Sequence, residues 1–113
     1  MYTGKIINDG VLYDVDRVVE HDGKFINPDY SLRVINHSPT GFCWGYNGSG
    51  PAQLALAILL EHFGGDQVRA KSLYQDFKSN VIANLPMDSD FELTDEQVES
   101  AISKIDIARM KAL

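Results

Sequence analysis

The chain has 113 residues, of which 44% are apolar and 23% charged, with a formal net charge of −6. This length and balance predict one globular domain spanning residues 1–113 and exclude wholesale disorder. The negative charge argues against direct binding of nucleic acid, because a phosphate backbone requires clustered lysine and arginine. The single cysteine, Cys43, excludes an intramolecular disulfide and a cysteine-rich zinc site.

The first residues do not combine a cationic segment with a long apolar run, so we expect no signal peptide. The longest apolar run, Leu54 to Leu60, is far shorter than the roughly 20 residues that a membrane helix needs. We therefore expect a soluble, cytoplasmic protein without a membrane partner.

Residues 1–46 are predicted to be mainly β-structure. Tyr2 to Ile7 is rich in strand-forming residues, and the Asp9-Gly10 pair is typical of a two-residue hairpin turn. Between Val11 and Val19, apolar residues alternate with polar ones, as in a strand with one buried face. Two acidic residues lie on the polar side of this strand and fit a solvated face: Asp14 and Asp16.

A second turn, at His21–Gly23, leads into a predicted strand at Lys24–Ile26. Because proline restricts the residue before it and lacks an amide hydrogen, we interpret Asn27-Pro28-Asp29 as the end of this strand. Residues Ser31–Asn36 are predicted as a further strand. Three aromatic residues then alternate along the chain, and an extended strand would place their rings on one face: Phe42, Trp44 and Tyr46.

Residues 51–108 are predicted to be mainly helical. Pro51 suits the first turn of a helix, which continues to about Phe63. This helix is apolar nearly all round, which indicates that protein surrounds it. The Gly64-Gly65 pair is typical of a left-handed helix end.

Asp66 can cap a second helix that reaches about Asn84, before Pro86. Its predicted inner face is apolar at helical spacing: Ala70, Leu73, Tyr74, Phe77 and Val81. A third helix begins at Thr94, which forms a capping box with Gln97. Its apolar face follows: Val98, Ala101, Ile102 and Ile105. Strands followed by helices predict an α+β fold, with an N-terminal antiparallel sheet of hairpins packed against about three C-terminal helices, the first one buried.

Residues 41–59 read GFCWGYNGSGPAQLALAIL, a turn rich in glycine and aromatic residues that leads into the apolar helix. This segment resembles a family of small bacterial, plasmid and phage proteins described only as a domain of unknown function. The resemblance extends to Phe77-Lys78 in the second helix and to the approach to the third, where it leads us to expect a tryptophan in place of Phe91. It implies a phage or mobile-element setting and supplies no reaction or cofactor.

The glycine-rich turn, residues 45–50, is the first candidate site. Glycine exposes backbone amides at a helix N-terminus, where they can hold an anion such as phosphate. The turn has neither the Walker A sequence nor the dinucleotide fingerprint. Neighbouring rings could stack a nucleotide base, and the proposed ligand-contacting residues are Trp44, Tyr46, Asn47, Gly48, Ser49 and Gly50. The alternative is a structural corner with the rings in the core.

Six acidic residues and no basic residue lie between Pro86 and Ser103. Such a segment is either a solvated face with a favourably charged helix start or a docking surface for a basic partner. The candidate partner-binding residues are Asp88, Asp90, Glu92, Asp95, Glu96 and Glu99.

Catalysis has weaker support in the sequence. Ser49 lies between two glycines, but their spacing differs from that of a nucleophile elbow. Cys43 could pair with His37 as a thiolate, or it could be a buried, inert thiol. His21, His37 and His62 lack the spacing of a zinc site, so we expect no metal and no cofactor.

Three functions therefore remain open. The first is a non-enzymatic protein that captures a small anionic or nucleotide-like ligand at the glycine-rich turn, acting in defence or anti-defence and able to form a homo-oligomer. The second is an acidic interaction protein that docks on a basic surface of a host protein. The third is a small hydrolase that uses Ser49 or Cys43. The sequence favours the first.

Overall fold

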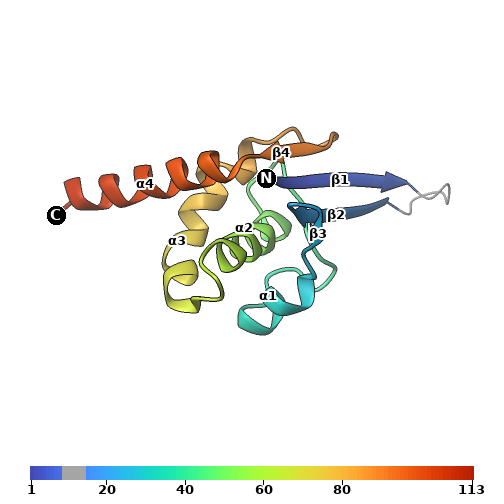
Figure 1. Cartoon of the computed structure of the whole chain (residues 1–113), viewed down its shortest axis with the longest axis horizontal. Helices are drawn as coiled ribbons and strands as arrows, with labels where there is room; N and C mark the ends of the chain where they lie inside the picture. The colour runs from blue at the N-terminus through green and yellow to red at the C-terminus, as the bar shows by residue number, and fades with distance from the viewer. Residues whose placement is uncertain (9–14) are drawn as a thin grey trace.

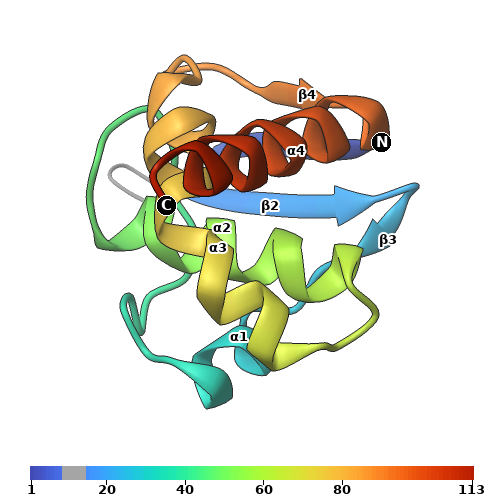
Figure 2. The ribbon, with the colours of Figure 1, turned by 90° about the vertical axis from the view of Figure 1, so that its left-hand side faces the viewer.

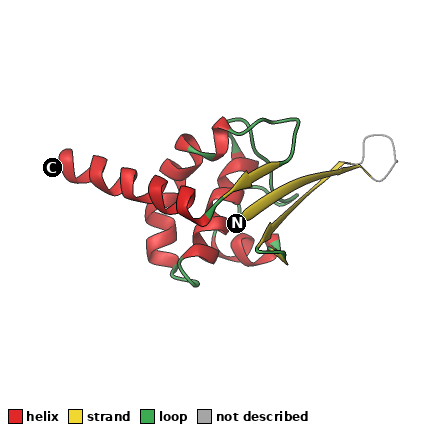
Figure 3. Cartoon of the chain, turned by 45° about the horizontal axis from the view of Figure 1, so that its top comes forward, coloured by secondary structure: helices red, strands yellow, loops and turns green. Residues whose placement is uncertain are grey.

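The computed structural model describes residues 1–8 and 15–113. An antiparallel sheet with the strand order β3-β2-β1-β4 lies at one side of the molecule, and the helices gather at the other (Figure 1, Figure 3). The α+β class predicted from the sequence is confirmed. Among the described residues, no helix has both the length and the hydrophobicity needed to cross a membrane.

The sheet has two longer and two shorter strands: β1 (Tyr2–Asn8), β2 (Val15–His21), β3 (Lys24–Phe25) and β4 (Phe91–Leu93). β1 pairs with β2 on one side and with β4 on the other. The predicted turn after β2 is confirmed, because Asp22 and Gly23 have φ angles of 51° and 81° and link β2 to β3. The predicted turn at Asp9-Gly10 and the strand positions from Val11 to Asp14 lie outside the described residues.

The strand predicted at Ser31–Asn36 is wrong, because most of this segment lies in helix α1 (Pro28–Val34). The side chain of Asn27 accepts a hydrogen bond of 3.0 Å from the amide of Asp29 and so caps the helix. Pro28 takes the first helical position, where a missing amide hydrogen costs nothing. The three residues that we interpreted as the end of a strand are therefore the start of a helix.

Helix α2 (Ser49–His62) forms the centre of the core, and every residue from Gly50 to Leu60 is buried. It lies between the sheet and α1 (Figure 2). It also packs against α3 (Gln67–Asn80) and the short 3-10 helix η1 (Ile82–Asn84). The buried helix predicted from the sequence is confirmed, as is its end at two glycines with positive φ angles.

Helix α4 (Asp95–Lys111) begins as predicted and ends beyond the other helices (Figure 1). The amide of Gln97 donates to the Thr94 hydroxyl (3.0 Å), and the Gln97 side chain accepts from the Thr94 amide (2.8 Å). Arg69 of α3 donates to both carboxylate oxygens of Asp106, at 3.2 and 2.6 Å, and so joins α3 to α4. The buried face of α4 consists of Val98, Ile102 and Ile105.

The aromatic residues before α2 do not form a strand, and their rings do not share a face. Gly45 has a φ angle of 89° and turns the chain, so Trp44 is buried while 42% of Tyr46 is exposed. The indole of Trp44 donates to the carbonyl of Ser89 (3.0 Å) and packs edge-on against Phe91, with ring centres 4.8 Å apart. Phe91 belongs to β4, a strand that the sequence did not predict, and it serves as the aromatic anchor at that position.

Candidate anion-binding pocket

A pocket of about 600 Å³ lies between the start of α2 and β2. One wall comes from the glycine-rich turn and the other from residues 16–19 of β2, with segments 25–28 and 38–43 completing it. Among the described residues, β3 pairs only with Glu20 and His21 of β2. After β3, the amide of Ile26 still donates to the carbonyl of Val19 (2.9 Å), and the pocket lies along the part of β2 that precedes this bond.

The start of α2 brings two backbone amides to this pocket. Ser49 and Gly50 are the first residues of the helix, so their N–H groups have no partner within it. In the described part of the chain, no backbone carbonyl outside the helix accepts from either amide. Pro51 follows and has no amide hydrogen. Free amides at a helix N-terminus, together with the helix dipole, favour an anion.

Arg17 of β2 adds a full positive charge to the wall. Its Nη2 donates to the carbonyl of Met87 (3.3 Å), and its guanidinium carbon lies 5.4 Å from the centre of a Trp44 ring. Within the described ranges, Arg17 forms no ion pair and its buried Nε has no hydrogen-bond partner. A guanidinium that is held in place without a counter-ion is suited to bind a carboxylate or phosphate.

The hydroxyl of Tyr46 lies against the same end of α2. A Cβ atom on Gly50 would be 3.3 Å from this oxygen and 2.6 Å from Cβ of Cys43, so only glycine permits the approach. Desolvation raises the pKa of Tyr46 above its ordinary value, the neighbouring Cys43 adds to the rise, and Arg17 opposes it. The phenol therefore stays protonated at neutral pH and can donate a hydrogen bond into the pocket.

Asp16 is the acidic residue in the described wall. Successive side chains of a strand point to opposite faces, so its carboxylate and the guanidinium of Arg17 leave β2 in opposite directions. Asp16 is exposed. Its charge acts against an anion through solvent, where the effect is reduced but not abolished.

The structure places only part of the predicted ligand-contacting set in this wall. Trp44 is fully buried, and its ring packs against the guanidinium of Arg17. The pocket wall contains Tyr46, Ser49 and Gly50 but not Asn47 or Gly48. Arg17 was not predicted as a site residue, although an arginine interrupts the otherwise apolar side of its strand.

The six acidic residues proposed as a partner-binding surface are divided by the structure. Asp90 accepts a hydrogen bond of 2.8 Å from the amide of Ile6, and Asp95 and Glu99 each contact a histidine. Half of the set is therefore used in internal contacts. In the described ranges, three exposed members form no ion pair: Asp88, Glu92 and Glu96.

The histidine proposed as a partner for Cys43 is held elsewhere. Nε2 of His37 is hydrogen-bonded to the hydroxyl of Tyr74 (2.7 Å), and its backbone amide donates to the side chain of Gln53 (2.8 Å). No histidine belongs to the described wall of the pocket. Among the described residues, no imidazole therefore lines the pocket beside Cys43 and Ser49.

The chain belongs to a family of unknown function, DUF6166, which it matches over residues 3–104. This range contains the sheet, the first three helices and most of α4, so the whole pocket lies in the part shared with the family. No curated protein and no solved structure matches the chain. The sequence resemblance to a family of unknown function is thereby confirmed.

Proposed function

We propose that the protein is a non-enzymatic binding protein that captures a small anionic, nucleotide-like ligand in the pocket between α2 and β2. One observation carries this proposal. Ser49 and Gly50, whose amides are free at the N-terminus of α2, and Arg17, which has no carboxylate partner among the described residues, line the same pocket.

The chemistry of the wall supports an anion rather than a cation. The amides of Ser49 and Gly50, the guanidinium of Arg17 and the hydroxyl of Tyr46 all donate hydrogen bonds, and a phosphate group accepts them. The volume of about 600 Å³ lies within the range of roughly 300–1,000 Å³ that is usual for small-molecule sites. A nucleoside monophosphate fits this size, with its phosphate at α2 and its base against the exposed ring of Phe25.

The proposed setting is the cytoplasm of a cell that carries a phage or plasmid, following the sequence resemblance. A protein that binds a nucleotide-like signal without converting it lowers the free concentration of that signal. Such a protein acts in defence or anti-defence according to whose signal it removes. Within this proposal, the identity of the ligand alone determines whether the protein acts in defence or in anti-defence.

Thermal unfolding and calorimetry with AMP, inorganic phosphate and adenosine test the proposal. We expect AMP and phosphate to raise the melting temperature and adenosine to have no effect, because only the anions engage the donors. Arg17→Gln should weaken AMP binding about tenfold or more, whereas Asp16→Asn should strengthen it by removing a nearby negative charge. Arg33→Gln, on an exposed position of α1, is the matched control and should bind like the wild type.

Arg17 also contacts Trp44, so tryptophan fluorescence must show that Arg17→Gln is folded. A measurement on the wild type removes the dependence on variants: the amide resonances of Ser49 and Gly50 should shift when AMP is added. The proposal fails if these resonances stay in place at millimolar AMP. It also fails if folded Arg17→Gln binds AMP as well as Arg33→Gln does.

A further inference from the structure

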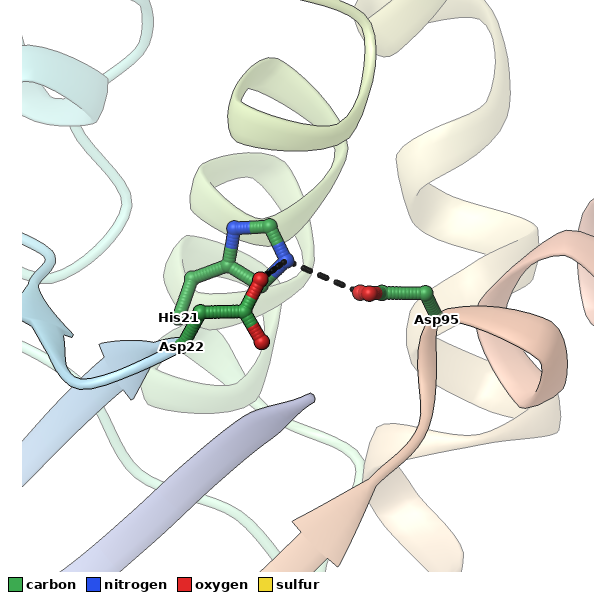
Figure 4. A group of neighbouring side chains, drawn as sticks. All are labelled: His21, Asp22 and Asp95. Atoms are coloured by element: carbon green, nitrogen blue, oxygen red, sulfur yellow. Dashed lines mark hydrogen bonds and ion pairs between the residues drawn. The ribbon is translucent and has the colours of Figure 1, made fainter.

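A second group of polar side chains lies at the end of β2, two residues beyond the pocket wall. Figure 4 shows His21 from β2, Asp22 from the following turn and Asp95 from the first turn of α4. Nε2 of His21 is 2.8 Å from Oδ1 of Asp95 and 3.6 Å from Oδ2 of Asp22. One ligand atom from each residue lies within 4.8 Å of the others. We predicted no metal site from the spacing of residues in the sequence. Such spacing does not reveal this group, because the fold brings its members together from separate segments.

A contact at the second ring nitrogen, Nδ1, orients the imidazole of His21. Nδ1 lies 3.3 Å from Oε1 of Glu61, near the end of α2. When Nδ1–H donates to this carboxylate, the lone pair of Nε2 faces Asp22 and Asp95. Histidines that bind metals are typically held in this way, with a carboxylate on the other ring nitrogen.

The two aspartates already share a cation. The amino group of Met1 lies 2.6 Å from Oδ1 of Asp22 and 3.2 Å from Oδ2 of Asp95. Hydrogen bonding to His21 lowers the pKa of Asp95, and the amino group adds to this effect. A divalent ion would take the place of the ammonium group between the two aspartates and of the Nε2 proton that His21 donates to Asp95, which is released to solvent.

The hydroxyl of Tyr2 is an independent observation at the same place. Tyr2 lies opposite His21 in the sheet, and its ring stacks on the imidazole with the centres 4.0 Å apart and the planes 13° from parallel. The side chain is fully buried, yet its hydroxyl has no hydrogen-bond partner in the described ranges.

The Tyr2 phenol lies in the electric field of the neighbouring carboxylates. Burial raises the pKa of Tyr2, and the charges of Asp95 and Glu61 are the next largest causes. The ring stacks on the imidazole of His21, so the phenol lies beside the group that these carboxylates contact. A buried hydroxyl without a partner is unfavourable, so the site favours a further polar group, such as a water molecule bound to a metal ion.

We propose that His21, Asp22 and Asp95 bind one divalent transition-metal ion of the zinc or manganese class, in exchange for the contact with the Met1 amino group. One imidazole and two carboxylates favour such ions over Mg²⁺ and Ca²⁺, which prefer all-oxygen sites. Water completes the coordination and supplies a partner for the Tyr2 hydroxyl. The ion connects the end of the sheet to the start of α4, and this inference does not depend on the proposed function.

Calorimetry and thermal unfolding of the metal-free full chain with ZnCl₂, MnCl₂ or MgCl₂ test the site. We expect one Zn²⁺ per chain, a higher melting temperature and binding of Mg²⁺ at least about tenfold weaker. His21→Ala and Asp95→Asn should each reduce the affinity for Zn²⁺ about tenfold or more. Glu96→Gln, an exposed acid next to Asp95 in the chain, is the matched control and should retain it.

A second measurement uses only the wild-type chain. Substoichiometric Mn²⁺ should broaden the imidazole resonances of His21 and leave those of His37 unchanged. The inference is overturned if Zn²⁺ does not bind at millimolar concentration, which would make this group an ion-pair cluster only. It is also overturned if Mn²⁺ broadens His62 instead of His21, or if folded His21→Ala binds Zn²⁺ like Glu96→Gln.

Discussion

Gln53 is a polar side chain in the apolar helix α2, and its replacement should destabilise the fold strongly. The side chain is fully buried. Its Oε1 accepts from the amides of His37 (2.8 Å) and Ser38 (3.1 Å), while its Nε2 donates to the Ser31 hydroxyl (2.9 Å) and the Ile35 carbonyl (3.0 Å). One side chain thus uses both its acceptor and its donor group to fix the chain between α1 and α2.

Gln53→Leu preserves most of the volume but leaves four polar groups without their partner. A net hydrogen bond contributes about 1 kcal/mol, and a buried group left unpaired costs about 1–3 kcal/mol. Since water can reach part of this half-buried segment, we expect the free energy of unfolding to fall by about 3–5 kcal/mol. Typical domains have only about 5–15 kcal/mol in total.

Urea denaturation followed by the fluorescence of Trp44, the only tryptophan and fully buried, measures this loss. Gln67→Leu, at an exposed position of α3, is the matched control and should change stability by less than about 0.5 kcal/mol. Gln53→Glu keeps the shape and should regain stability as the pH falls toward about 4, because its buried carboxyl group becomes neutral. A loss below about 1 kcal/mol for Gln53→Leu, with unchanged hydrogen exchange at the amide of His37, would refute the reasoning.

Three other substitutions test the contacts that join the sheet and the helices. Thr94→Ala removes the capping box of α4 and should cost about 1 kcal/mol in urea denaturation. The Arg69 guanidinium lowers the pKa of Asp106 below its ordinary value of 3.8, so this pair stabilises the fold above that pH and its contribution is lost as the pH falls through the lower, folded-state value. Thermal unfolding of Asp106→Asn should therefore show a weaker acid dependence than that of the wild type. Gly4→Ala would place a Cβ atom 2.1 Å from the ring of Phe91, which must then move, and we expect a loss of about 1–3 kcal/mol and altered near-ultraviolet circular dichroism.

Much of the helical part of the fold was predictable because its signals are local. The apolar residues of α2 and the capping box of α4 each lie within one short segment. The error at α1 has a physical origin, since Asn27-Pro28-Asp29 serves equally to end a strand and to cap a helix. Only the packing of that segment on α2, fixed by Gln53, decides between the two. β4 is too short for a periodic pattern, and it pairs with β1, a strand that lies far from it in the sequence.

Only the side of the pocket that α2 provides was predictable from the sequence. Glycine and serine before an apolar helix indicate free amides, so Ser49 and Gly50 could be identified from their neighbours in the chain. Arg17 could not be assigned to the same pocket, because its distance from α2 is set by how β2 packs. Gln53, a glutamine within an apolar run, indicates polar partners at the start of α2, because a buried amide requires hydrogen-bond partners. The histidine contacts of Asp95 likewise depend on where α4 begins relative to the sheet.

The two proposed sites share one strand and can be separated experimentally. Arg17 and His21 are four residues apart and lie on the same face of β2, with the buried Val19 two residues from each. If the sites are independent, Arg17→Gln should leave Zn²⁺ affinity unchanged, and Asp95→Asn should leave AMP affinity unchanged, within about twofold in calorimetry. If each variant weakens both ligands equally while Glu96→Gln weakens neither, the common cause is a displaced β2. In that case the losses report the packing of the strand, and only the resonance shifts of the wild-type chain can assign either site.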